Sequence, residues 1–453
     1  MDNNIHKKYG LPTAISMVVG NVIGSGLFFK ASKVMKNNNG NMLKSILTVA
    51  AVGMVMLVCA YVFSMLAARV EKVNGFIDYS DMACGPLYAY SVGWFTATMF
   101  YPTITACLAW ISANYIIILF GINLGWWFHY LFAAVLLLLS FLLNILSPKL
   151  SGNFLISTTV IKLIPILIMA IAGTVAGLIN GTTVENLTSS HSSITGGGGL
   201  FSAIIAFAFA YEGWIFVTSI NAEIKDSKKN LPRALFFGSI IIISAYVLYF
   251  LGLMGVLSAE KIVASGDDLP RAAFSALFGS PVFGTLIYVF VVISCLGTMN
   301  GLMLACTRAM YSVAIRGEGI APELFSKVNK KTDVPTASAF FGLGMALIWL
   351  TQWQLGFING YFPRFLSFEN DELPIVIFYS ACIPIFIYVM RKCTDLGVIK
   401  RFIIPSLACL ASAFMVFCAV YSYRLDALYY FIVFIAVMAI GLLFYKKKNK
   451  KQN

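Results

Sequence analysis

Two ionisable side chains lie inside long apolar runs of this sequence, where each could hold a ligand or carry charge. Lys162 lies in the apolar run 160–165, and Glu212 lies in the run 206–214, directly before Gly213. A charge at the centre of a bilayer costs about 2.5–3.5 kcal/mol on insertion scales, so each group should face a cavity or a partner. The alternatives are that Lys162 snorkels to the membrane interface and that Glu212 is a charge in an outward-facing vestibule.

A cluster of small residues interrupts the first apolar run. Gly20, Gly24, Ser25 and Gly26 lie within seven residues of one another, and glycine weakens a helix by about 1 kcal/mol relative to alanine. If the helix unwinds there, its bare N–H groups and the positive end of the following half-helix form an anion site that fits a carboxylate. Close helix packing through Gly20-x-x-x-Gly24 is the alternative.

The elements that position these residues are membrane helices. Of the 453 residues, 59% are hydrophobic and 11% are charged, whereas soluble proteins carry about 25% charged residues. Twelve apolar stretches reach the length of about 20 residues that a membrane helix needs. We predict spans at 11–35, 43–68, 86–119, 127–146, 154–180, 200–223, 234–257, 281–312, 336–353, 373–391, 402–424 and 427–445. The interruptions then fall in the first and sixth spans, a pattern that indicates a transporter site.

The distribution of positive charge predicts cytoplasmic N- and C-termini. With the N-terminus inside, most of the 32 Lys and Arg residues fall on the cytoplasmic side. Lys30, Lys33, Lys36 and Lys44 break this rule, because they surround the first outer loop. The net charge of +13 therefore reflects helix ends, and we expect the bilayer, not nucleic acid, as the partner.

Enzyme, metal and channel functions lack the residue patterns that they need. The three histidines form no H-E-x-x-H motif, G-x-S-x-G is absent, and the nine cysteines form no C-x-x-C pair with histidine partners. No repeated filter or charged ring indicates a channel. We therefore expect no enzyme, no metal site and no cofactor.

Several segments together resemble the amino acid–polyamine–organocation (APC) transporters. The segments 24–28, 209–214 and 223–234 resemble the family's first-helix signature and the exit of its sixth helix, and 297–301 and 308–311 resemble its eighth helix. The likeness covers about residues 10–350 and is strongest to bacterial relatives of the L-type amino-acid transporters, which exchange alanine, serine and cysteine.

The resemblance implies an all-α membrane protein with two inverted repeats of five helices, discontinuous first and sixth helices, and two appended helices. The corresponding divisions are a cytoplasmic N-terminus at 1–10, the repeats at 11–180 and 200–391, the last two spans at 402–445, and a cytoplasmic basic tail at 446–453.

The resemblance also assigns roles to residues of the two interruptions. It implies that the backbone of Ile23, Gly24, Ser25 and Gly26 binds the substrate carboxylate. Carbonyl groups near Phe207, Ala208 and Ala210 would bind the ammonium group, and Phe209 would be an aromatic gate, with ordinary packing as the alternative for Phe209.

Relatives also imply roles for residues on neighbouring helices. The Lys162 ammonium would bridge the first and fifth helices where sodium-coupled relatives hold an ion, and Tyr246 would link this region to the broken helices. Ser294, Thr298 and Asn300 could line the cavity, or hydrogen-bond between helices.

Two departures from the family pattern bear on specificity and partners. Thr218 replaces an asparagine that is frequent in eukaryotic L-type members, and the outer loop 121–127 lacks the cysteine that tethers those members to a heavy chain. We expect a multi-pass plasma-membrane carrier without that heavy chain, which exchanges small neutral L-amino acids (alanine-, serine- and cysteine-like) without sodium. A proton-coupled symporter, in which Glu212 or Lys162 would titrate, remains an alternative. A cationic amino-acid or amine antiporter is another, for which Glu212 would be the buried acid.

Overall fold

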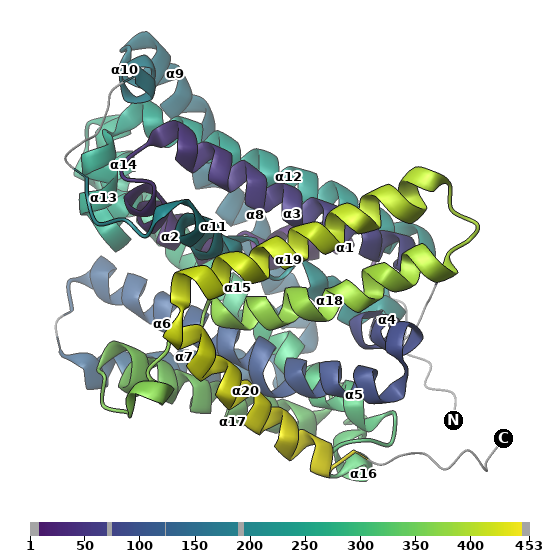
Figure 1. Ribbon diagram of the computed structural model, residues 1–453. Helices are drawn as coiled ribbons and strands as arrows, with labels where there is room; N and C mark the ends of the chain where they lie inside the picture. Colours follow the sequence, from purple (N-terminus) through teal and green to yellow (C-terminus); the bar gives the residue numbers. More distant parts are fainter. Residues whose placement is uncertain (1–8, 70–74, 123, 189–193, 446–453) are drawn as a thin grey trace, which may run out of the picture.

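The computed structural model describes residues 9–69, 75–122, 124–188 and 194–445, and its ribbon consists almost entirely of helices (Figure 1). The predicted basic tail 446–453 and most of the predicted N-terminal segment 1–10 lie outside these described residues. The all-helical membrane fold expected from the sequence is confirmed.

Across the described ranges, eleven helices are long and apolar enough to cross a membrane, or twelve if a bent pair counts as one span. The spans comprise α1 (Leu11–Val22) with α2 (Ser25–Asn37), α3 (Met42–Ala67), α5 (Pro86–Phe95) with α6 (Tyr101–Phe120), α7 (Trp126–Leu146), α8 (Pro148–Ile168) with α9 (Thr174–Ile179), α11 (Gly199–Ala208) with the 3-10 segment Trp214–Glu223, α12 (Ser227–Val256), α15 (Pro281–Ala314), α17 (Thr336–Thr351), α18 (Leu373–Lys392), α19 (Ile404–Tyr423) and α20 (Leu425–Leu443). Shorter helices connect them: α4 (Gly75–Cys84), α10 (Thr182–Thr188), α13 (Ala259–Ser265), α14 (Leu269–Phe278) and α16 (Pro322–Phe325).

Several helix boundaries differ from those predicted. The fifth span begins at Pro148, not at residue 154, because Pro148 occupies a favourable first position of the helix and the polar turn behind it stays helical. Ser227, which falls between the predicted spans 200–223 and 234–257, is the buried first residue of α12. Wide π-helical turns, which hydropathy does not reveal, interrupt the spans at Thr96–Phe100, Met169–Gly173 and Gln352–Ile358.

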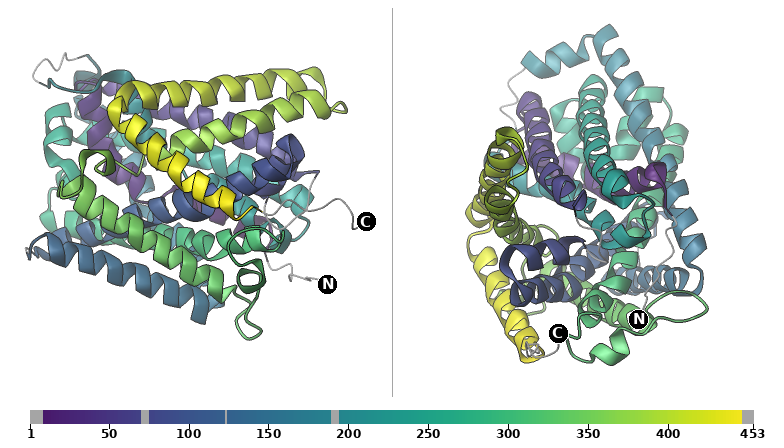
Figure 2. Two further views of the ribbon diagram at one scale, coloured as in Figure 1. Left: turned by 60° about the horizontal axis from the view of Figure 1, so that its bottom comes forward. Right: turned by 90° about the vertical axis from the view of Figure 1, so that its right-hand side faces the viewer.

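Burial separates the central helices from the peripheral ones. The sixth span is the most enclosed, with 83% of its apolar window buried, whereas only 11% of the window in α20 is buried. The helices α18, α19 and α20 lie together along one side of the bundle (Figures 1 and 2). Since the exposed side chains of α19 and α20 are largely Leu, Ile, Phe and Val, these faces suit contact with lipid.

Candidate functional site

The first span is broken where the glycine cluster predicted it. α1 ends at Val22, Ile23 and Gly24 leave the helical conformation, and α2 starts at Ser25 with a bend of 42° between the two helices. A Cβ on Gly24 would lie 2.6 Å from Thr298 Oγ1, and one on Gly26 would lie 2.5 Å from Ala210 Cα. Both interpretations of the glycine cluster therefore hold, because the glycines allow the helix to break and also allow close packing between helices.

The sixth span is broken at Glu212 and Gly213. α11 continues as a 3-10 turn, Phe209–Tyr211, after which Glu212 is extended and Gly213 adopts a left-handed φ of 107°. This φ favours glycine, and a Cβ there would also lie 2.7 Å from the backbone oxygen of Asn21. The two breaks thus face each other, as the sequence predicted.

Tyr246 of α12 joins the two breaks. Its buried hydroxyl group lies 3.1 Å from the Val22 carbonyl oxygen and 2.8 Å from that of Ala210. One phenol therefore holds the end of α1 beside the broken sixth span, which is the geometry that the resemblance implied.

A small cavity lies between the breaks. The two broken spans supply one part of its wall, and α6 and α15 supply the other. The lining residues are Asn21, Val22, Gly24, Gly26, Phe209 and Glu212 from the broken spans, Ile104 and Leu108 from α6, and Thr298 and Leu302 from α15.

Lys162 lies beside this cavity and is fully buried, so it does not snorkel to an interface. Its Nζ donates to the Gly20 carbonyl oxygen over 2.7 Å and to Thr298 Oγ1 over 2.9 Å. The ammonium group therefore joins three spans through α8, α1 and α15.

The other polar candidates on α15 separate into different environments. Thr298 lines the cavity and contacts Lys162. Asn300 does not line it, and instead hydrogen-bonds to Ser140, Asn144 and Ser151 between helices. Ser294 lies outside the cavity lining as well. Only Thr298 of these three is thus placed for contact with a ligand.

The carbonyl groups expected to bind an ammonium group are only partly available. The Ala210 carbonyl oxygen already accepts from Tyr246, and neither Phe207 nor Ala208 is among the lining residues. The ring of Phe207 packs against Tyr211, Tyr246 and Phe250. Phe209 lines the cavity.

Glu212 lines the cavity and is buried. Among the described residues, no side chain hydrogen-bonds to either of its carboxylate oxygens. A buried carboxylate without a cationic partner is costly, so this group is available to a ligand.

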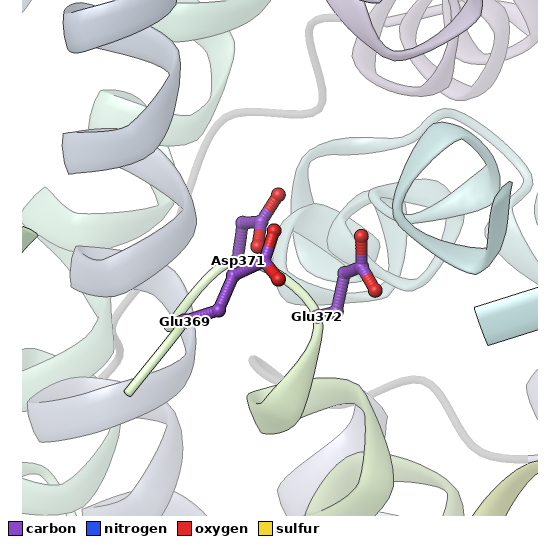
Figure 3. Close-up of side chains that lie close together, drawn as sticks. All are labelled: Glu369, Asp371 and Glu372. Carbon is purple, nitrogen blue, oxygen red and sulfur yellow. The ribbon is translucent and has the colours of Figure 1, made fainter. Parts of the chain in front are cut away.

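A cluster of charges missed in the sequence closes one end of the bundle. Lys30 and Lys33 of α2 meet Glu369, Asp371 and Glu372, which precede α18, and these five residues with Tyr423 of α19 are called the Glu372 cluster. Figure 3 shows the three carboxylate groups side by side where the chain enters α18. Lys30 Nζ lies 2.5 Å from Glu372 Oε1 and 2.6 Å from Asp371 Oδ2, and Lys33 Nζ lies 2.7 Å from Glu369 Oε1.

The Glu372 cluster also reaches Phe209 and α19. Lys30 Nζ lies 5.3 Å from the ring centre of Phe209, within the range of a cation–π contact. The Tyr423 hydroxyl group lies within hydrogen-bond distance of both Glu369 and Glu372, which share its one hydrogen. The three carboxylate groups are spaced closely enough to hold a metal ion, but Lys30 brings its own positive charge to them.

Burial and neighbouring charge shift the two buried carboxyl groups in opposite directions. Burial raises the pKa of Asp371 to about 7, because the stabilising charge of Lys30 only partly offsets it and the nearby Glu369 and Glu372 raise this pKa further. Burial opposes the charge on Glu372 too, but Lys30 and Lys33 overcome it and lower the pKa of Glu372 to about 2. Lys30 therefore lies between Asp371 and an ionised Glu372, at nearly equal distances from both.

Ion pairs also close the opposite end of the bundle, here called the Tyr9 end. Arg308 of α15 pairs with Glu223, which follows the broken sixth span, and Arg316 pairs with Asp78 of α4. The backbone of Tyr9 pairs with Glu223 and Lys225. The cavity thus lies between two charged closures.

Comparison with known proteins decides the family. The model of the amino acid permease family matches residues 9–453. The chain belongs to the amino acid permease family. The APC resemblance drawn from the sequence is confirmed, and this permease is a membrane transporter of amino acids, not an enzyme.

Curated relatives of this permease cover most of its length. The serine/threonine exchanger of Bacillus subtilis (strain 168) is 29% identical over 77% of this chain and 77% of its own. The human cystine/glutamate transporter is 28% identical over 92% of this chain and 81% of its own. The human b(0,+)-type amino acid transporter 1 is 26% identical over 98% of this chain and 88% of its own.

Proposed function

We propose that this permease exchanges small neutral L-amino acids, such as alanine, serine and cysteine, across the plasma membrane by alternating access and without sodium. The cavity between the two breaks supports a substrate site there, because residues of both broken spans line it. A relative that is a serine/threonine exchanger by name supports the transport of amino acids by exchange.

The contact of Lys162 with α1 and α15 carries the proposal. Its ammonium group is held by the Gly20 carbonyl and the Thr298 hydroxyl, directly beside the break in the first span. A positive charge fixed there can hold α1 and α15 together in place of a bound sodium ion. Such a carrier needs no second ion to complete its site.

The substrate would lie across the two breaks. We propose that its carboxylate group accepts from the backbone N–H groups at Gly24, Ser25 and Gly26, where α2 begins and the helix dipole favours an anion. Its ammonium group would be bound by carbonyl oxygens of the sixth span near Phe209, and Phe209 would cover the substrate.

Counterflow in proteoliposomes tests this function. Vesicles loaded with serine should take up external labelled alanine, whereas empty vesicles should not. Replacing sodium with choline should leave the rate unchanged, and an imposed pH gradient should not drive uptake into empty vesicles. Sodium dependence would contradict the role of Lys162, and pH-driven uptake would favour a symporter.

Glu212 favours a second candidate, an exchanger of cationic amino acids or amines. Its buried carboxylate lines the cavity without a side-chain partner in the described part of the chain, and a cationic side chain would satisfy it. Competition by lysine and arginine distinguishes the two functions. Inhibition by lysine that exceeds inhibition by serine, and that is lost in Glu212→Gln, would establish the second candidate.

We also propose that both termini are cytoplasmic and that the permease works without a disulfide-linked heavy chain. The excess of Lys and Arg on the predicted inner side supports the orientation. The absence of cysteine from the loop 121–127 supports independence from such a partner.

A further inference from the structure

Asn21 has a polar side chain that is buried without a hydrogen-bond partner among the described residues. It is 1% exposed, is the last residue but one of α1, and lines the cavity. Neither its Oδ1 nor its Nδ2 has a hydrogen-bond partner among the described residues. A buried amide in this state is unfavourable unless a ligand completes its hydrogen bonds.

Other buried asparagines of this permease show what a structural amide looks like. Each of these side chains hydrogen-bonds to a neighbouring helix, turn or loop: Asn38, Asn144, Asn186, Asn300 and Asn370. Asn21 is the one that combines an unpartnered carboxamide with a position on the cavity wall. A structural role in tying helices together therefore does not account for it.

The surroundings of Asn21 make room for its carboxamide and limit its movement. A Cβ on Gly301 of α15 would lie 2.1 Å from Asn21 Oδ1, and a Cβ on Gly213 would lie 2.7 Å from the Asn21 backbone oxygen. Two glycines on different spans thus leave the space that the residue fills. The Asn21 carboxamide packs directly against Gly301 of α15, which limits its movement away from the cavity.

The chemistry of the cavity decides which substrate group Asn21 would meet. The proposed sites for the substrate carboxylate and ammonium groups use backbone atoms of the breaks, so only the substrate side chain remains. Ile104, Leu108 and Leu302 offer that side chain an apolar wall. Asn21 offers both a donor and an acceptor, which a hydroxyl group can satisfy and an alkyl group cannot.

We infer that Asn21 is a specificity-determining residue that selects amino acids with a hydroxyl-bearing side chain, serine and threonine, over alanine. This inference rests on the proposed exchange of neutral amino acids. The substrate hydroxyl accepts from Asn21 Nδ2 and donates to Asn21 Oδ1 or to the carboxylate of Glu212. Alanine leaves the carboxamide unpaired, and a site built to hydrogen-bond a hydroxyl group disfavours an analogue that lacks it.

Competition against labelled serine in serine-loaded proteoliposomes tests the inference. For the wild type, half-inhibition by alanine should need about three- to tenfold more amino acid than half-inhibition by serine, which corresponds to one net hydrogen bond. Asn21→Leu, which keeps the volume, and Asn21→Ala, which does not, should both bring this ratio close to one. The ratio is measured within one preparation, so a low yield of folded protein does not affect it.

Tyr430→Phe is the matched control. It removes another buried polar group that has no partner among the described residues, but from α20 and away from the cavity, so the ratio should stay at the wild-type value. An unchanged ratio in both Asn21 variants overturns the inference, and so does an equal loss of serine and alanine binding. If wild-type vesicles show no counterflow with any neutral amino acid, the proposed function itself fails.

Discussion

Lys162 is the residue on which the proposed independence from sodium depends. Its ammonium group contacts one carbonyl of α1 and one hydroxyl of α15, and it is shielded from solvent on all sides. The side chain is thus part of the machinery that holds the first break in shape, although it does not itself line the cavity.

Lys162→Ala should lower the exchange rate about tenfold or more, while the protein remains folded. The substitution leaves the Gly20 carbonyl and the Thr298 hydroxyl without this donor, at a cost of about 1–3 kcal/mol. Counterflow in proteoliposomes measures the rate. Lys149→Ala, an exposed lysine on the same helix, is the control, and a normal rate for Lys162→Ala would remove this residue from the mechanism.

Whether a residue of the site can be recognised from the sequence depends on its chemical type. Lys162 and Glu212 were found because an ionisable group inside an apolar run is unusual. Asn21 was not singled out, because polar uncharged residues in membrane helices usually pair with each other, and only the structure shows that this one does not. Asn300 illustrates the usual case.

At the scale of elements, a few tertiary contacts hold the half-helices of the broken spans in place. The Tyr246 hydroxyl group joins the ends of both broken spans, and the Glu372 cluster joins α2 to α18 and α19. Since each broken span lacks part of its own helical hydrogen bonding, these contacts determine where the half-helices lie.

Tyr246→Phe should destabilise the folded carrier by about 1 kcal/mol, because two buried carbonyl groups lose the one hydroxyl hydrogen that they share, and it should slow exchange. The apparent unfolding temperature in detergent and the counterflow rate measure these effects. Tyr249→Phe is a close control on the same helix, since its buried hydroxyl has no partner among the described residues. Equal effects of the two substitutions would mean that the phenol does not join the breaks.

Glu372→Gln should loosen the end of the bundle that the Glu372 cluster closes. Removing one partner from a buried ion pair costs about 3–5 kcal/mol, so α2 should separate more often from α18. Cys107 reports this movement, because it is fully buried and contacts Asn370 beside the cluster. Its alkylation by a water-soluble maleimide, followed by mass spectrometry, should become about tenfold faster or more.

Arg364→Gln provides the comparison for that experiment. Arg364 forms an ion pair of 2.6 Å with Asp426, but its side chain is 64% exposed, and exposed pairs contribute at most about 1 kcal/mol. Cys107 should react at the wild-type rate in this variant. The same rate in Glu372→Gln would show that the cluster does not hold this end closed.

The ion pairs of the Glu372 cluster could not be predicted from the sequence. Lys30 and Lys33 were recognised only as exceptions to the charge rule, and the acidic segment 369–372 resembled an ordinary loop. More than 330 residues separate the partners along the chain, so nothing local connects them. The breaks themselves were predicted correctly, because glycines beside polar residues mark them locally.

At the scale of the whole molecule, charge and burial indicate how the bundle lies in its membrane. The exposed apolar faces of α7, α19 and α20 point away from the core, whereas the two charged closures lie at opposite ends. The proposed orientation places the Tyr9 end in the cytoplasm and the Glu372 cluster outside.

Thiol labelling tests this orientation in whole cells. Cys84 is exposed and belongs to α4, which pairs with Arg316 at the Tyr9 end, so an impermeant maleimide should label it only after permeabilisation. Lys36→Cys, at an exposed position near the end of α2, should be labelled in intact cells. The reverse pattern would contradict the proposed topology.

A positive charge that is covalently bound at the first break also has a thermodynamic consequence. A sodium ion enters from one compartment and leaves into the other, and so transfers the energy of its gradient to the cargo, whereas the Lys162 ammonium group returns with the protein after every cycle. On the proposed function, the permease does no concentrative work of its own. It adjusts the composition of the intracellular amino-acid pool while the total stays constant, and other transporters must supply the imbalance that it redistributes.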